Sequence, residues 1–451
     1  MLSSQCWRRG WTGARNLIAI LTLRIASGRR YLTRISDGSF IYKTLQTSGV
    51  TDPVAPKRWA ALDAFRGLAV IGMLLVNNPG EHDAVYRQLA HSEWNGCTIA
   101  DLVFPFFLFA VGITTALGAP KGGLVAESSR SVARICRRAT IIFAIGFLIN
   151  WFPFYQSGSI SFTDHPGFVD RVLARLLLVR IPGVLQRIAI AYLVVALVAR
   201  RVSARVMIAF TVVILVGYWA LLMLVPVPGE GVVGSVVFND PGRTIVAHAD
   251  RWLFDWTRSG LGNHLWDSAL TWDPEGALST ISATATMMIG YVCGAFALTL
   301  ERTTRAKRFL MAGATMTVAG TVWSLVLPLN KALWTSSFAL YTAGIAAVIL
   351  ALLTAVVDDE RREALVRPLI VFGENPLIAY AGSELTRRIV HSSIKVRGAS
   401  GRLGLDEWVS VSLEQMGFSA KAASLAWALL FLLLWWVLLE RLSRRGLFVR
   451  A

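Results

Sequence analysis

The chain has 451 residues, of which 55% are hydrophobic and only 16% are charged. A soluble core of this size does not need so much apolar sequence, so the composition excludes an ordinary soluble enzyme and predicts an integral membrane protein. The formal net charge of +17 would suit nucleic-acid binding, but the Lys and Arg residues stand in short clusters at the ends of hydrophobic segments. That pattern reports membrane topology, so we expect a lipid bilayer and no nucleic acid as partner.

The chain begins with a basic arm. Between residues 1 and 50 arginine recurs, and Asp37 is the single acidic residue. Such a composition suits a transit peptide, an anchor that lies on a membrane surface, or a stretch upstream of the true start codon. We expect residues 1–57 to be a dispensable extension, disordered or not translated, and residues 58–445 to form a single transmembrane domain.

Ten hydrophobic stretches follow, each near the roughly 20 residues that a helix needs to cross a bilayer. The ninth contains Asn375, Pro376 and Glu384, which predicts a broken helix or one that lines a cavity. The predicted fold class is all-α, a polytopic transmembrane helix bundle of about ten transmembrane helices. The stretches are 60–77, 99–118, 139–154, 183–199, 206–225, 279–298, 308–327, 333–356, 366–386 and 423–439.

The clusters of Arg and Lys between these stretches all fall on one side of the predicted membrane. The positive-inside rule makes that side cytoplasmic and places both termini there, as in a multi-pass protein of a bacterial inner membrane. The outer face then carries all six histidines and the loop 226–278, which we expect to fold as a cap over this face. No Cys and His stand at metal-ligand spacing, so no metal site is expected.

The most concentrated polar region joins the first stretch to the second. Asp101 stands inside the apolar run of the second stretch, where an unpaired carboxylate costs roughly 3 kcal/mol. A turn and a helix cap at Asn95 explain the neighbouring polar residues but not this carboxylate. His91 is the expected partner, because a carboxylate fixes the tautomer of an imidazole that acts as a general base. The candidates here are Asn77, Asn78, His91, Trp94, Asn95 and Asp101.

Two further polar groups stand near helix starts. Gln186 and Arg187 lie about one turn inside the fourth stretch, where the arginine needs a carboxylate. Asp101 or a substrate group would supply it, and snorkelling to the membrane surface is the alternative. Asp273 and Glu275 precede the sixth stretch and suit either the dipole of that helix or a substrate.

A short outer loop, 328–334, carries Asn330 and Lys331 side by side. The positive-inside rule predicts few lysines on this face. We therefore expect Lys331 to bind an anionic group of a substrate, although an interfacial position would also explain it.

Six motifs in this order resemble the catalytic membrane domain of heparan-α-glucosaminide N-acetyltransferase and its bacterial relatives, within the transmembrane acyltransferase superfamily. Any one motif alone is weak, but six in order are specific. The resemblance spans residues 58 to about 356 and, less clearly, FGENPLIAY at 372–380. The motifs are LDAFRG, LVNNPG, HSEWNGCTIADLVFPFFLF, RIPGVLQRIAIAY, WDPEGALSTI and PLNKALWTSSF.

The resemblance implies transfer of an acetyl group from cytosolic acetyl-CoA to an amino-sugar or glycan acceptor on the outer face. It assigns the active histidine to His91, as general base or acyl carrier, and the residue pattern adds Asp101 as its expected catalytic partner. Asn77, Asn78 or Asn95 would then donate hydrogen bonds to the thioester oxyanion. The candidate substrate contacts are Asn77, Trp94, Gln186, Arg187, Asp273, Glu275, Asn330 and Lys331.

Acetyl-CoA is the only co-substrate that the resemblance implies. Its nucleotide is too large and charged to cross the membrane, so we expect it near the cytoplasmic residues Arg66, Arg137 and Arg138. The positive-inside rule explains these arginines equally well.

Other functions stay open on the sequence alone. A multi-helix solute or lipid transporter without acyl chemistry would also need buried polar residues and a capped outer face, although no internal repeat supports it. A scaffold subunit of an envelope-polysaccharide system and a homodimeric assembly stay open too.

Overall fold

The computed structural model of the chain is mostly helical. The chain divides into two units, Met1–Arg58 and Trp59–Ala451. In the first unit, β1 (Leu32–Arg34) pairs antiparallel with β2 (Phe40–Tyr42), and the rest of the basic arm lies outside the described residues. The structure describes residues 32–34, 40–42, 59–119, 129–155, 167–266, 272–357, 364–398 and 401–448.

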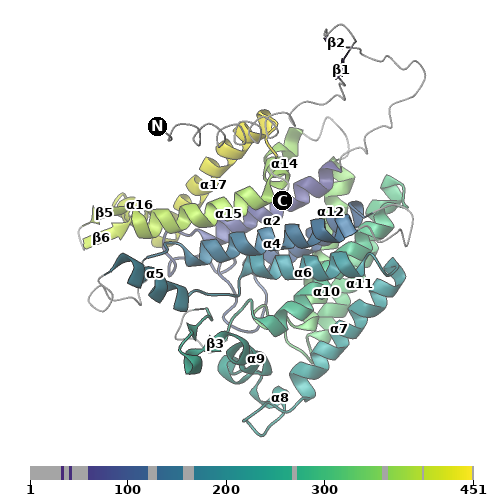
Figure 1. Cartoon of the computed structure of the whole chain (residues 1–451), viewed down its shortest axis with the longest axis horizontal. Helices are drawn as coiled ribbons and strands as arrows, with labels where there is room; N and C mark the ends of the chain where they lie inside the picture. The colour runs from purple at the N-terminus through teal and green to yellow at the C-terminus, as the bar shows by residue number, and fades with distance from the viewer. Residues whose placement is uncertain are drawn as a thin grey trace, which may run out of the picture. The chain divides into compact units, whose positions relative to one another are not determined.

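Each of the ten hydrophobic stretches forms a helix in the second unit (Figure 1). The ninth is divided at Asn375, between Glu374 and Pro376, so the expected break is confirmed. Proline lacks the N–H that a helix interior needs and restricts the residue before it, which ends the first half. The helices are α2 (Ala60–Asn77), α3 (Ile99–Leu117), α4 (Ser129–Trp151), α6 (Val184–Val198), α7 (Ala204–Leu224), α10 (Ala277–Ala297), α11 (Arg302–Trp323), α12 (Ser336–Val357), α14 (Arg367–Glu374), α15 (Pro376–Arg388) and α17 (Ala420–Arg444).

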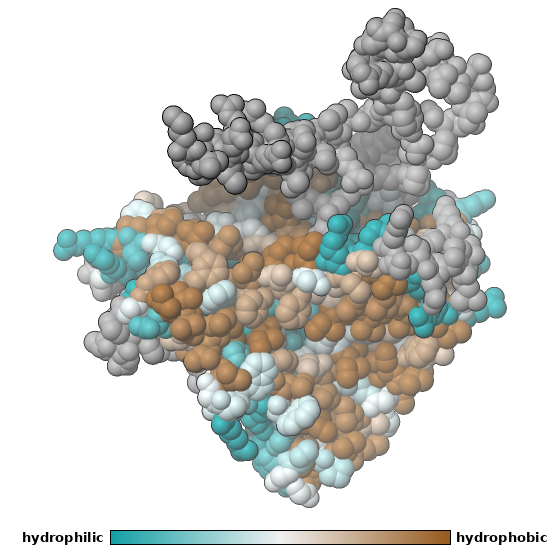
Figure 2. Space-filling model, in the orientation of Figure 1, coloured by the Kyte–Doolittle hydropathy of each residue, from teal (hydrophilic) through white to brown (hydrophobic). Residues whose placement is uncertain are grey.

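The surface of these helices is that of a membrane protein. Within the described residues, six helices are long and apolar enough to cross a membrane: α2, α3, α7, α10, α12 and α17. Figure 2 shows hydrophobic residues over much of the visible face of the bundle. Side chains such as Val213, Met311 and Leu434 are 60% or more exposed, which a water-facing surface avoids. The expected membrane character is therefore confirmed, while the number of crossings stays a prediction.

Close glycine contacts hold together the helices that carry the site. A Cβ on Gly112 of α3 would lie 2.1 Å from the carbonyl oxygen of Met287 in α10, and one on Gly290 of α10 would lie 2.1 Å from that of Phe109 in α3. Gly67 likewise brings α2 against α14. Small residues let helix backbones approach in this way, which strengthens packing where no hydrophobic effect acts between helices.

The long loop 226–278 folds into short elements. It forms α8 (Gly234–Val237), α9 (Ile245–Phe254) and the antiparallel pair β3 (Asp255–Trp256) and β4 (Gly262–Asn263). Phe238 and Val246 pack with Tyr218 of α7 in a small apolar cluster. The loop is therefore a folded layer, as expected of a cap, and its position on the outer side of a membrane stays a prediction.

The remaining elements flank the helices. They are η1 (Pro241–Arg243), η2 (Thr257–Ser259), η3 (Ala364–Val366), α5 (Phe168–Leu177), the π-helical turn η4 (Ile389–Ser393), the antiparallel pair β5 (Lys395–Gly398) and β6 (Gly401–Gly404), and α16 (Leu405–Gln415).

Candidate active site

His91 and Asp101 form a hydrogen-bonded pair at the start of α3, so the expected contact between them is confirmed. The carboxylate is fully buried, and its Oδ1 lies 2.9 Å from His91 Nδ1. When Nδ1–H donates to the carboxylate, the neutral ring presents Nε2 as its acceptor. The imidazole side chain is 44% exposed, so it is open to a reactant.

The second oxygen of Asp101 completes the cap of α3. Oδ2 accepts hydrogen bonds from the backbone N–H and hydroxyl of Ser92, at 3.1 and 3.0 Å, and from those of Thr98, at 3.0 and 3.1 Å. The helix cap is therefore Thr98, and the expectation that Asn95 caps this helix is wrong. Asp101 serves the helix start and the histidine together, which accounts for its place in an apolar run.

Lys331 joins the pair from a loop 240 residues further along the chain. Its Nζ lies 3.1 and 3.2 Å from the two ring nitrogens of His91 and 3.7 Å from Asp101 Oδ1. Burial lowers the pKa of Lys331, and the Asp101 carboxylate opposes that shift. One cation is thus shared between an imidazole and a carboxylate, where it would also meet a negatively charged reacting atom.

The two loops of this site are tied together at Gly96. Its φ of +122° is in the left-handed region that favours glycine, and its N–H donates to the carbonyl oxygen of Leu329 at 2.8 Å. Asn330 is fully buried and holds the second loop, because its Oδ1 accepts the Leu333 N–H at 2.8 Å. These bonds place His91 and Lys331 next to each other.

A second charged group, which the sequence reasoning missed, centres on Arg180. Its Nε and Nη2 donate to the two oxygens of Asp273 at 2.8 and 2.6 Å, and Nη2 also contacts Glu275. Burial favours a protonated Glu275, but the positive charges of Arg180, Arg187 and Lys331 together outweigh burial and lower the pKa of Glu275. The available signal was an arginine in an apolar segment of the predicted outer face, where the positive-inside rule expects few.

Arg187 contacts groups other than Asp101, which was one of the two partners expected for it. Its guanidinium is buried and donates to Ser279 Oγ at 2.5 Å and to the carbonyl oxygen of Pro274 at 2.9 Å. The guanidinium carbon lies 5.1 Å from the centre of the Trp334 ring. The expected pairing with Asp101 is wrong, and so is snorkelling. Arg187 instead fixes the start of α10 through neutral groups.

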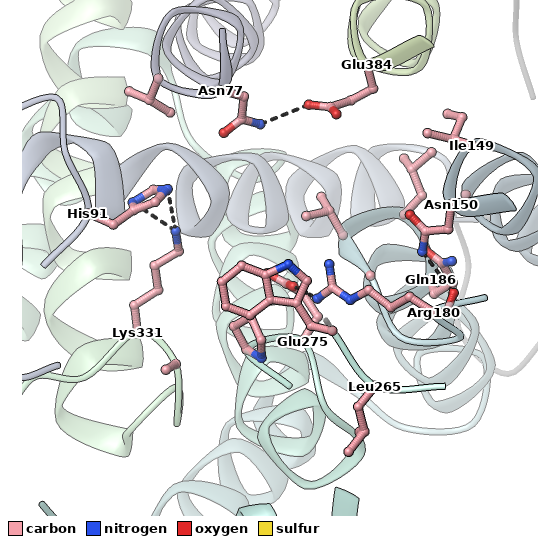
Figure 3. A pocket seen from close by; sticks show the side chains of 18 of the residues that line it. Asn77, His91, Ile149, Asn150, Arg180, Gln186, Leu265, Glu275, Lys331 and Glu384 are labelled. Atoms are coloured by element: carbon pink, nitrogen blue, oxygen red, sulfur yellow. Dashed lines mark hydrogen bonds and ion pairs between the residues drawn. The ribbon is translucent and has the colours of Figure 1, made fainter. Parts of the chain in front are cut away.

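A cavity of about 720 Å³ is lined by His91, Asp101, Arg180, Glu275 and Lys331 among others, and its volume is in the range that holds whole small-molecule ligands. Figure 3 shows His91 and Lys331 side by side on one wall and Arg180, Gln186 and Asn150 across from them. Asn77 Nδ2 donates to Glu384 Oε1 at 3.2 Å, which joins α2 to α15 between the two walls. Trp94, Trp266 and Trp272 add aromatic surface, and the first two each pack edge-on against Trp272.

The cavity brings together about half of the residues proposed from the sequence. Those that line it are Asn77, His91, Trp94, Asp101, Gln186, Glu275 and Lys331. Those that do not line it are Arg66, Asn78, Asn95, Arg137, Arg138, Arg187, Asp273 and Asn330.

Several residues of the second set have local partners. Asn78 is buried and donates to the carbonyl oxygen of Leu74 at 2.7 Å. Asn95 donates to Asn239 Oδ1 at 2.8 Å and accepts from Asn330 at 3.3 Å.

The three arginines proposed for acetyl-CoA lie away from the cavity lining. Arg66 pairs with Asp63 at 3.2 Å, and the Arg138 guanidinium lies 4.8 Å from the centre of the Tyr192 ring. Arg137 is exposed on α4.

The fold and the site define a helical membrane protein with an Asp–His–Lys group at the wall of a ligand-sized cavity. Residues 58–231 match the family model described as heparan-alpha-glucosaminide N-acetyltransferase, catalytic. The chain is 29% identical over 385 residues to heparan-alpha-glucosaminide N-acetyltransferase of Homo sapiens and 28% identical over 378 residues to that of Mus musculus. Each alignment covers 73% of this chain and 53% of the relative, so the chain spans about half the length of these relatives. These matches support the resemblance to this family that the motifs indicated.

Proposed function

We propose that the protein is a membrane-embedded acyltransferase that moves an acetyl group from acetyl-CoA to the amino group of an amino-sugar or glycan acceptor. The observation that carries the proposal is the Asp101–His91–Lys331 group at the wall of a ligand-sized cavity. The names of the relatives, which are N-acetyltransferases, support the same chemistry.

In the proposed reaction, the acceptor amine attacks the carbonyl carbon of the thioester. A carbon–nitrogen bond forms, the carbon–sulfur bond breaks, and the thiolate of CoA leaves. His91 Nε2 takes the proton that the amine loses and passes it to the leaving sulfur. Asp101 holds Nδ1–H and so keeps the ring in the tautomer that this step needs. An acetylated His91 is the alternative path to the same products.

Negative charge develops on the carbonyl oxygen during the attack. Lys331 Nζ lies beside both nitrogens of His91 and would meet this oxygen as a cation. Asn77 is the candidate amide donor because its side chain lines the cavity. Asn78 and Asn95 are weaker candidates, since each is engaged in local hydrogen bonds away from the cavity lining.

The donor and the membrane topology complete the proposal. Acetyl-CoA would approach from the cytoplasmic side, where Arg66, Arg137 and Arg138 would contact its phosphates before the acetyl group reaches the cavity. We place both termini in the cytoplasm of a bacterial cell and His91 on the outer side of the inner membrane. A homodimer is compatible with this arrangement.

The test is release of CoA by the purified chain in lipid nanodiscs, with glucosamine and short amino-sugar glycans as acceptors. Acceptor-dependent release that is absent in His91→Ala supports the proposal. Radiolabelled acetyl-CoA without acceptor separates the two paths, because only an acetyl-histidine path leaves label on the protein. Wild-type protein that neither binds nor consumes acetyl-CoA would refute the function and favour solute or lipid transport.

A further inference from the structure

The cavity has a cationic end that the proposed chemistry does not use. Arg175 comes from α5, and Arg387 and Arg388 come from the last turn of α15, and all three line the cavity. Arg175 Nη2 donates to the carbonyl oxygen of Asn150 at 2.8 Å, and Arg388 Nη1 donates to that of Phe152 at 3.3 Å. Because these carbonyls are two residues apart, the two guanidinium groups lie close together.

The ion pairs around the cavity leave two of its arginines without a carboxylate of their own. Lys331 has Asp101, Arg180 has Asp273 and Glu275, and Arg387 has Glu384 at 3.1 Å. In the part of the chain that the structure describes, neither Arg175 nor Arg388 forms an ion pair with a carboxylate. Their partners are backbone carbonyl oxygens, namely Asn150 and Leu178 for Arg175 and Phe152 for Arg388. Two positive charges therefore face one cavity without an ion-pair partner of their own, and the nearby Glu384, which acts on Arg388, is already paired with Arg387.

A purely structural role accounts for only part of this arrangement. Carbonyl groups at the end of α4 need donors, and a cation there also suits the helix dipole. One arginine would meet that need, yet two converge on it, and the Nε atoms of both are buried without a hydrogen-bond partner. Like charges brought together at a cavity wall, with donors to spare, are typical of a site for an anion.

We propose that Arg175 and Arg388, supported by Arg387, form a subsite for an oxyanion, a carboxylate or phosphate group carried by one of the two substrates. This inference rests on the proposed function, because it places the subsite in the same cavity as His91. The planar guanidinium fork matches the oxygens of either group. Two sources supply such a group: an acidic sugar next to the acceptor amine, or the phosphates of acetyl-CoA. The subsite would make the acidic member of a substrate pair the better substrate.

The experiment compares matched substrates with the double variant Arg175→Gln/Arg388→Gln in nanodiscs. The acceptors are two disaccharides in which glucosamine is linked to glucuronic acid or to glucose. The donors are acetyl-CoA and S-acetylpantetheine, which lacks the phosphorylated nucleotide. Arg258→Gln is the matched control, because Arg258 is exposed and does not line the cavity.

We expect the double variant to raise KM roughly tenfold or more for the acidic member of one pair and to leave its neutral partner within about twofold. A change limited to the glucuronate disaccharide assigns the subsite to the acceptor, and a change limited to acetyl-CoA assigns it to the donor. Unchanged KM values for all four compounds, with only a lower thermal midpoint, would mean that the arginines merely cap α4.

Two further measurements keep the inference testable if the double variant folds poorly or if no turnover is found. Arg175→Lys/Arg388→Lys keeps both charges but loses the fork, so it should raise KM for the acidic substrate less than the glutamine variant does. Equilibrium binding of the N-acetylated disaccharides and of CoA needs no turnover. Binding that prefers the acidic member in wild type and loses this preference in the variants supports the subsite even if acyl transfer fails, and equal binding overturns it.

Discussion

Two histidine–aspartate pairs in this chain have nearly the same geometry and different surroundings. His91 Nδ1 lies 2.9 Å from Asp101, and His391 Nδ1 lies 3.0 Å from Asp406. The two imidazoles are 44% and 40% exposed, and both carboxylates are buried. Distance and burial alone would therefore rank the pairs as equals.

Their neighbours separate them. Asp101 accepts four further hydrogen bonds, and Lys331 reaches its histidine. In the second pair, Asp406 Oδ1 is buried without a partner, Glu407 lies 3.9 Å from the histidine, and neither His391 nor Asp406 lines the large cavity. A histidine–aspartate pair therefore supports a catalytic role only when a cation can meet the developing charge and a cavity can hold the substrate.

The largest expected effect is the contrast between the two histidines. His91→Ala should lower kcat for acetyl transfer by about 10³-fold or more, because it removes the proposed base. His391→Ala should leave kcat within about threefold, since the second pair has no part in the proposed reaction. CoA release by the two purified variants measures both. Equal losses of kcat in the two variants would mean that the His391–Asp406 pair also takes part in the reaction.

The next effect concerns the carboxylate. Asp101→Asn should lower kcat roughly 10²-fold to 10³-fold, because an amide N–H facing Nδ1 favours the wrong imidazole tautomer. KM for either substrate should change far less. Steady-state kinetics at a fixed concentration of protein, with the folded fraction checked by size exclusion, measure the loss of kcat. They distinguish it from poor expression of the variant. A normal kcat in correctly folded variant would leave Asp101 with only its helix-capping role.

A smaller loss is expected for the cation. Lys331→Gln should lower kcat roughly 10-fold to 100-fold. The loss is smaller because Asn77, the proposed amide donor to the oxyanion, is still present. Lys331→Arg keeps the charge and should recover part of the rate. If both variants lose activity equally, charge at this position is irrelevant and only the shape of the loop matters.

The smallest predicted effects are changes in the free energy of unfolding when each aspartate is replaced. Asp406→Asn should change the free energy of unfolding by less than about 1 kcal/mol, because its partner histidine is partly exposed. Asp101→Asn should cost about 1–3 kcal/mol, since several donors lose an ionised acceptor in a buried position. Thermal unfolding in one detergent compares the two. A larger loss for Asp406→Asn would show that the second pair is the more important one for folding.

Much of the fold followed from the sequence because hydrophobic length is a strong signal. All ten stretches are helices, and the break at Pro376 was visible as a polar interruption. The boundaries moved most in α4, which begins ten residues before the apolar stretch because its first turns are basic rather than apolar. Hydropathy locates the apolar segment that a bilayer requires, but it does not locate the first residue of a helix whose N-terminal turns are polar.

The site was predictable only where a local anomaly marked it. Asp101 and Lys331 each stand out in their own segment, so both were found. Arg180 was missed because its carboxylates lie more than 90 residues away in the chain. Asp101, one of the two partners expected for Arg187, is not in contact with it for the same reason, since depth in the membrane predicts the need for a partner but not which partner the packing supplies.

The bond between Gly96 and Leu329 has a consequence for how this chain can be dissected. It fastens together two loops that are distant in sequence, so the functional group exists only when both halves are present. A fragment cut to the matched region, residues 58–231, would contain the histidine and its carboxylate but neither the lysine nor the acidic partners of Arg180. Such a fragment would keep the region that matches the family model but would lack Lys331, Asp273 and Glu275. A match confined to that region therefore does not define the smallest active unit.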